Sequence, residues 1–107
     1  MPTEPNSYDL VITGGRVLDP ANNIDAKLDI AVSNSKIAAV ETSIDASISK
    51  RTIDATGLVV TPGLIDLHTH AADGIRKSVN DDFMVDADTA GVSAGVTTIL
   101  DAGSIGA

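Results

Sequence analysis

Hydrophobic and polar residues alternate in short runs over the first half of the chain, the pattern of half-buried β-strands. The clearest run is residues 27–32, where Leu28, Ile30 and Val32 share one face of the predicted strand and Lys27 and Asp29 lie on the other. Turn-forming residues separate this run from its neighbours. The pattern predicts strands at residues 8–13, 16–18, 27–32, 36–40, 52–54 and 58–60.

Glycines and small polar residues mark the connections between these strands. Gly14-Gly15 predicts a tight hairpin turn, and the Ser-Asn-Ser segment at 33–35 predicts a second turn. Residues 19–25 have the composition of a loop, and residues 41–51 predict a loop or a weak helical turn. Hairpins repeated at this spacing predict a small β-sandwich or barrel module.

The pattern changes at Pro62-Gly63. Apolar residues between 58 and 67 predict a buried strand that ends at two histidines, and residues 71–82 read as a loop. A helix is predicted over 86–94, with Asp86 at its N-terminus and Gly95 just after its end. The β-branched run 96–100 predicts another strand. Strand, helix and strand form one βαβ unit, which requires a parallel sheet.

The amino-acid composition excludes several classes of partner and metal site. The chain has 107 residues, 43% hydrophobic and only 2% aromatic, so its core is built from aliphatic residues. The net charge of −8 argues against nucleic acid or an anionic membrane as a partner. Without cysteine, a metal site can use only histidine and carboxylate ligands. No signal peptide or membrane span is recognisable, so we expect a soluble, cytoplasmic protein.

Candidate chemistry gathers at the ends of the two later strands. His68 and His70, the only histidines, share one face of a strand and aim two imidazoles at one point, which is half of a zinc-type site. Asp66 lies on the same face, either as an acceptor that orients an imidazole or as a structural carboxylate. Asp101 and Ser104 follow the next strand and either line a substrate pocket or form an ordinary turn.

These residues carry a resemblance to a known family. The segment TPGLIDLHTH is similar to the first barrel strand of the amidohydrolase superfamily, which includes dihydroorotases, hydantoinases and related deacetylases. The lead-in segments YDLVITGGRVLDP, DIAVSNSKIAAV and IDATGLVVTPG resemble its N-terminal β-sandwich. The segment GVTTILDAGSIGA resembles its second barrel strand, in the amidohydrolase/deacetylase branch near dihydroorotase.

The resemblance implies an α/β fold with a β-rich N-terminal part. By this resemblance, residues 8–61 would form the N-terminal part of a small β-sandwich, and residues 62–107 would begin a (β/α)₈ TIM barrel. That last segment would supply barrel strand 1, helix 1 and strand 2. Because such a barrel takes about 250 residues, the barrel is incomplete in this chain. Residues 1–7 are polar with two prolines, and this composition predicts disorder.

The resemblance also implies chemistry. A divalent metal, most often zinc and one or two per enzyme, activates water for attack on an amide, cyclic amide or acyl ester of a small-molecule substrate. His68 and His70 would bind the more buried metal, and Asp101 and Ser104 would line the pocket. The remaining family ligands, a bridging carboxylate, two histidines and an aspartate, come from later strands. We therefore expect an N-terminal piece of such an enzyme, inactive alone.

Two other interpretations of the chain remain open at this point. The chain could be a non-catalytic barrel remnant, whose open sheet edge favours a homo-oligomer and which needs no metal. Alternatively, two or more copies could share His68 and His70 across an interface and form a four-histidine metal site. The sequence itself does not choose the substrate or the number of metal ions.

Overall fold

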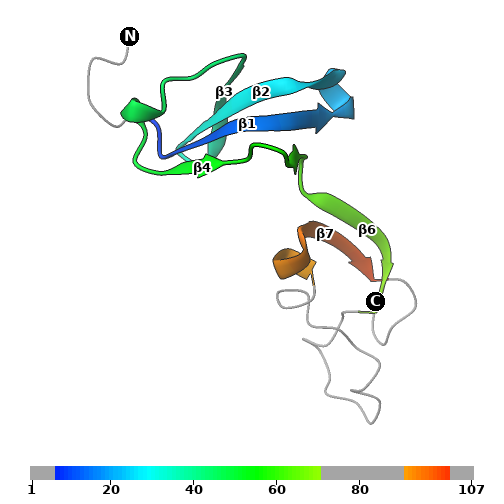
Figure 1. The fold of residues 1–107 in the computed structure, drawn as a ribbon. Coiled ribbons are helices and arrows are strands. Elements are labelled where there is room, and N and C mark those ends of the chain that lie inside the picture. Colours follow the sequence, from blue (N-terminus) through cyan, green and yellow to red (C-terminus); the bar gives the residue numbers. More distant parts are fainter. Residues whose placement is uncertain (1–6, 71–90, 102–107) are drawn as a thin grey trace. The chain divides into compact units, whose positions relative to one another are not determined.

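The computed structural model describes residues 7–70 and 91–101 (Figure 1). The chain divides into two compact units, Met1–Pro62 and Gly63–Ala107, and each is described by itself. The predicted disorder of residues 1–7 lies outside the described residues, apart from Ser7.

The described part of the first unit forms one five-stranded sheet. Three strands, β3, β2 and β1, lie side by side with β4 next to β1, and β5 also pairs with β1 (Figure 1). The β1–β2 and β2–β3 pairs are antiparallel, whereas β4 and β5 run parallel to β1. The elements are β1 (Leu10–Asp19), η1 (Pro20–Asn22), β2 (Ile24–Ser33), β3 (Lys36–Glu41), η2 (Ala46–Ile48), β4 (Thr52–Asp54) and β5 (Val59–Val60), where η marks a 3₁₀ helix.

The turn predicted at residues 33–35 is confirmed. Asn34 and Ser35 have φ angles of 52° and 61°, so two consecutive residues adopt the left-handed conformation. A two-residue turn of this kind matches the right-handed twist of the flanking strands. It joins β2 to β3, and Ser33 pairs with Lys36 across it.

The hairpin predicted at Gly14-Gly15 is wrong, because β1 continues through both glycines. Ile12 pairs with Ile30 and Gly15 pairs with Leu28, so residues 13 and 14 of β1 face residue 29 alone on β2. Two residues opposite one define a β-bulge. Gly14 has a φ of 74°, a conformation that glycine adopts without steric cost. The two glycines therefore bend a long strand instead of ending it.

The carboxylate of Asp29 holds this bulge. It accepts hydrogen bonds from the backbone N–H of Gly14 at 2.8 Å and from that of Ile44 at 2.9 Å. Ile44 belongs to the small core that it forms with Val11 and Ala31, both of them fully buried. One part-buried side chain therefore links the irregular point of β1 to the loop that covers the core.

The short strands predicted at residues 52–54 and 58–60 are present as β4 and β5, but they do not pair with each other. Val11 pairs with Thr52 and Arg16 pairs with Val59, so both short strands add to the same edge of β1. The turn between them closes with a 2.8 Å hydrogen bond from the Leu58 N–H to a carbonyl three residues earlier. Adjacent strands in the sequence need not pair with each other when a longer strand is available to both.

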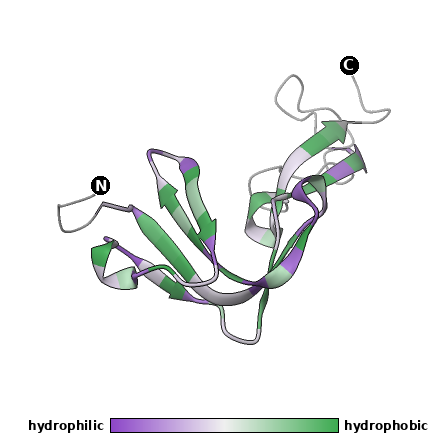
Figure 2. Ribbon diagram, turned by 90° about the horizontal axis from the view of Figure 1, so that it is seen from above, coloured by the Kyte–Doolittle hydropathy of each residue, from purple (hydrophilic) through white to green (hydrophobic). Residues whose placement is uncertain are grey.

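The predicted β-sandwich is only partly present, since the described residues of the first unit form a single sheet. Hydrophobic and hydrophilic residues both occur along the strands (Figure 2). One face of the sheet carries an apolar groove of about 550 Å³, lined by Ile12, Ile30, Ile37, Val40 and Val60 among others. Ile37 is 63% exposed there.

The second unit contains a parallel pair of strands, β6 (Leu64–Thr69) and β7 (Val96–Asp101). The parallel pairing confirms that part of the predicted βαβ unit. Most of the predicted helix over 86–94 lies outside the described residues; its described end is a 3₁₀ helix, η5 (Val92–Ala94), which Gly95 ends with a φ of 85°. In the described part of the chain no helix is long and apolar enough to cross a membrane.

We predict that Gly14→Ala destabilises the chain more than Gly57→Ala. Both glycines have positive φ angles, 74° and 78°, so either alanine costs about 1–2 kcal/mol in backbone strain. A Cβ at Gly14 would also lie 2.7 Å from the Oγ1 of Thr56, whereas a Cβ at Gly57 meets nothing within 4 Å. Overpacking adds about 1–3 kcal/mol to the first substitution only. Urea denaturation measures both differences.

The double variant Gly14→Ala/Thr56→Ala is the control for this contact. Removing the Thr56 hydroxyl should bring the cost down to that of Gly57→Ala. Equal stability of Gly14→Ala and Gly57→Ala would contradict the close approach to Thr56.

We also predict that acid weakens the first unit. The ammonium of Lys50 and the backbone N–H of Asn34 donate to Asp9 and lower its pKa, and the Arg16 guanidinium does the same for the pKa of Asp25. Carboxylates whose folded pKa is lowered stabilise fully above their unfolded value, about 3.9. Their contribution is lost as pH falls through the folded pKa. The urea midpoint should therefore hold from pH 7 to 5 and fall below about pH 4.

Asp9→Asn provides the comparison for the acid transition. This variant has no carboxylate to protonate at that position, so its urea midpoint should depend less steeply on pH below 4 than that of the unsubstituted chain. Identical pH dependence in the two proteins would show that the Asp9–Lys50 interaction does not carry the effect.

Candidate metal centre

Strand β6 carries the candidate ligands to the edge of the second unit, but it is not the buried strand that its sequence predicts. Leu64, Ile65 and Leu67 are 55%, 64% and 69% exposed. Within the described residues β6 pairs only with β7, so one strand neighbour cannot cover its apolar side chains. The apolar composition is correctly identified, whereas burial depends on packing that β6 and β7 alone do not supply.

The start of β6 is fixed by a close approach to β7. Gly63 lies against Thr97, and a Cβ on Gly63 would be 2.7 Å from the Cβ of Thr97 and closer still to its Oγ1 and Cγ2. The next N–H, that of Leu64, donates to the carbonyl of Gly95 at 2.9 Å. The Pro-Gly sequence before β6 therefore has a packing reason, because only a residue without a side chain fits beside Thr97.

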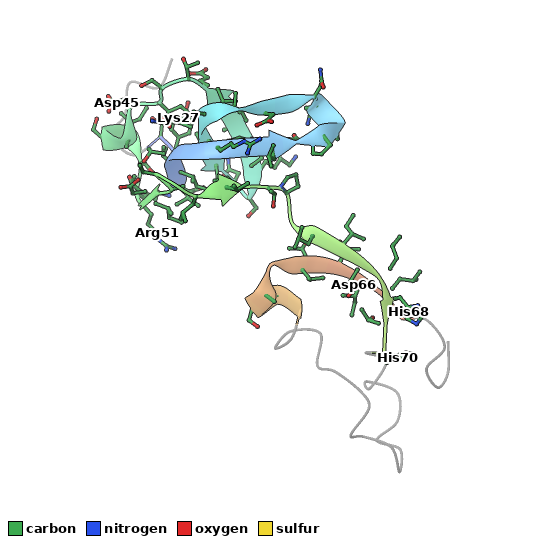
Figure 3. The ribbon with its side chains drawn as sticks, turned by 45° about the vertical axis from the view of Figure 1, so that its right-hand side comes forward. Lys27, Asp45, Arg51, Asp66, His68 and His70 are labelled. Carbon is green, nitrogen blue, oxygen red and sulfur yellow. The ribbon has the colours of Figure 1, made fainter. Side chains whose placement is uncertain are left out.

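The two histidines lie together at the carboxyl end of β6 (Figure 3). The ring centroids of His68 and His70 are 5.5 Å apart and the ring planes meet at 74°. Both side chains are exposed, and His70 follows directly after the last strand residue. The two imidazoles therefore lie side by side at the end of the strand.

The contact that Asp66 makes in the structure is to the backbone. Its Oδ1 accepts a hydrogen bond from the backbone N–H of His68 at 3.0 Å. This bond fixes the backbone that carries the imidazole. A contact between the carboxylate and an imidazole stays a prediction.

Of the two predicted pocket residues, the structure describes the backbone position of only one, Asp101. Asp101 is the last residue of β7, and its Cα pairs in register with that of Thr69, between the two histidines in sequence. Ser104 lies outside the described residues. A pocket role for either residue remains a prediction.

The donor set fits part of a zinc site. Neutral imidazoles are common zinc ligands, and zinc sites use three or four protein ligands. In the ranges 7–70 and 91–101, no cluster of three or more histidine, cysteine, aspartate or glutamate residues could hold a metal. The pair His68–His70 therefore offers two ligands, and the remaining ligands of a closed site are not among the described side chains.

One further residue of this region, Thr69, was not among the site residues predicted from the sequence. Its Oγ1 donates to the carbonyl of Leu100 on β7, across 3.1 Å. Thr69 is also the one residue of β6 that is half-buried. The residue between two histidines gives no signal in the sequence, because a threonine at a strand end is common for reasons of strand propensity alone.

Comparison with proteins of known sequence identifies a relative. The chain is 41% identical over 90 residues to a dihydroorotase of Geobacter metallireducens, and the match covers 84% of this chain. It covers only 21% of the dihydroorotase, so the chain spans about a fifth of the relative's length. No family profile matches the chain.

Comparison with solved structures also finds alignments that cover most of this chain but only a small part of each matched protein. An N-acyl-D-glutamate deacylase from Bordetella bronchiseptica, solved with zinc and a phosphonate inhibitor, aligns with a TM-score of 0.66 and 29% identity. An adenine deaminase aligns with a TM-score of 0.67 and 36% identity. The alignments cover 90% and 91% of this chain, but 18% and 24% of those proteins.

We predict that Gly63→Ala disrupts the β6–β7 pairing. The added Cβ would overlap Thr97, so β7 must move away from the start of β6. Hydrogen exchange at the amide of Leu64, which bonds to Gly95, should become faster.

The double variant Gly63→Ala/Thr97→Gly tests the cause of that change. It removes the opposing side chain and should restore protection of the Leu64 amide toward that of Thr97→Gly alone. Unchanged exchange in the single Gly63→Ala variant would contradict the close approach.

Proposed function

We propose that this chain, which is related to the N-terminal portion of amidohydrolase-superfamily enzymes, provides the first two metal ligands of a metal-dependent amidohydrolase. The observation that carries the proposal is the pair His68 and His70, whose rings lie 5.5 Å apart at the carboxyl end of a parallel strand. Active sites of parallel α/β barrels are built at that end of the strands.

The residues of this chain have separable tasks in the proposed site. The imidazoles of His68 and His70 would hold a divalent ion, most often zinc, and Asp66 would fix the backbone between them through its bond to the His68 N–H. Such an ion supplies Lewis acidity and lowers the pKa of water. Asp101 and Ser104 would lie on the substrate side.

The proposed reaction class is hydrolysis of an amide, a cyclic amide or an acyl ester. The dihydroorotase relative favours a cyclic amide, and the deacylase favours an acyl-amino acid. Two imidazoles alone leave at least one zinc coordination position without a protein ligand. The proposed reaction therefore requires the complete metal site, to which this chain contributes the two imidazoles.

A second candidate function, an oligomerisation module without catalysis, is favoured by a different observation. Four apolar side chains of β6 and β7 are more than half exposed: Leu64, Ile65, Leu67 and Leu100. Apolar residues gathered on a strand pair are a common basis of self-association. This candidate requires no metal, so its mass in solution would exceed that of the monomer whether or not zinc is present.

We predict that the purified chain takes up zinc through its two histidines. Zinc measured by mass spectrometry after dialysis, together with a calorimetric titration, should show binding that is lost in both His68→Ala and His70→Ala. The physical reason is that a chelate of two ligands requires both. Glu41→Gln removes an exposed carboxylate of β3 and should bind zinc as the unsubstituted chain does.

Light scattering in the same samples separates the alternatives. Zinc uptake with a mass that rises only when zinc is added would indicate that copies share their histidines. A mass above the monomer with no zinc uptake would support the oligomerisation module and contradict the metal site. Zinc uptake that survives the loss of both histidines would also contradict it.

A further inference from the structure

The end of β6 is irregular at the position of the metal-ligand pair. Asp66 pairs with Ile99 and Thr69 pairs with Asp101, so two residues of β6, Leu67 and His68, lie opposite one residue of β7. This is a bulge in the strand that carries the histidines. Bulges next to functional sites redirect side chains and locally disrupt the ladder of hydrogen bonds.

A bulge makes the orientation of His68 and His70 depend on more than strand alternation. In a regular strand, alternate side chains point to the same side. An extra residue changes the local twist, so the strand period alone no longer fixes the angle between the two imidazoles. Some other contact must define the backbone across the bulge if the rings are to remain 5.5 Å apart.

Two side-chain bonds bracket this irregular segment. On one side, Asp66 accepts from the backbone N–H of His68 at 3.0 Å. On the other, the Thr69 hydroxyl donates to the carbonyl of Leu100 at 3.1 Å. Leu100 is the residue of β7 that faces the bulge, so the Thr69 hydroxyl ties β6 to β7 where the ladder is interrupted.

We infer that Thr69 is a positioning residue for His68 and His70, a role that rests on the metal site proposed above. Its hydroxyl anchors the peptide that joins the two histidines to the neighbouring strand and so holds their imidazoles at a chelating separation. Threonine suits this task because its β-branched side chain is restricted at χ1 and its hydroxyl supplies the donor. Thr69 itself does not ligate the metal.

The test compares two substitutions of Thr69 in the full chain. Thr69→Val keeps the shape of the side chain and removes the donor, whereas Thr69→Ser keeps the donor and removes the methyl group. Zinc affinity is measured by competition with a chromophoric chelator, and geometry is measured by the visible absorption of the Co²⁺-loaded chain. Hydrogen exchange at the Leu64 amide reports whether β6 and β7 remain paired.

We expect Thr69→Val to weaken zinc binding about 10–100-fold, the usual effect of removing a group that orients a ligand. Its Co²⁺ spectrum should change, while Thr69→Ser should retain both the affinity and the spectrum. The Leu64 amide should stay protected in both variants. Unchanged affinity and spectrum in Thr69→Val would overturn the inference, as would an equal loss in both variants that accompanies loss of Leu64 protection.

A measurement without metal separates this inference from the proposed function. If the unsubstituted chain binds no zinc beyond the level of His68→Ala, the proposed metal site fails. Nuclear Overhauser contacts between the two imidazoles then decide the role of Thr69. Contacts that are lost in Thr69→Val and kept in Thr69→Ser would support ring positioning by the hydroxyl, and contacts that persist in both variants would overturn it.

Discussion

The first unit depends on the hydrogen bonds that the Asp29 carboxylate makes to the N–H groups of Gly14 and Ile44. The first bond holds a bulge in β1, the only strand that pairs with β2, β4 and β5 among the described elements. The second places Ile44 over Val11 in the core. A buried N–H without an acceptor costs about 1–3 kcal/mol, so the two bonds stabilise the sheet register and the core together.

In the second unit, too, a carboxylate bonds to the backbone of an irregular strand. An aspartate, Asp66, accepts a backbone N–H beside a bulge, and the irregular strand is the one that carries the functional candidates. In both units a carboxylate takes up a donor where the ladder is irregular. Backbone polar groups need partners, and a bulge creates positions at which the neighbouring strand cannot provide them. Thr69 adds the same kind of support from the other side of the bulge.

The sequence predicted those features that depend on local geometry. The turn at Asn34 and Ser35 follows from the conformations of two consecutive residues. Two histidines that are one residue apart are neighbours along the chain, and their rings do lie close together. It failed at Gly14, because two glycines are compatible with a turn or with a bulge, and the choice depends on Asp29, fifteen residues away. The strands β4 and β5 were predicted, but their partner was not, because both pair with β1, which is distant in the sequence. The role of Thr69 could not be predicted from the sequence, because it depends on a hydrogen bond to Leu100, thirty-one residues later in the chain.

Burial and metal ligation are linked requirements in β6. Strands of parallel sheets are covered on both faces, yet Ile65 and Leu67 remain largely exposed beside the histidines. Water around an exposed pair of imidazoles competes for the metal and weakens the electrostatic effect of the ion, so a hydrolytic site needs the same cover that the apolar side chains need. Metal binding in sites of this kind is coupled to folding, because the ligands are brought together only when the strands pack. In the proposed site, the separation of His68 and His70 is therefore the part that β6 and β7 can define by themselves, whereas a catalytic metal would also need dry surroundings packed against β6.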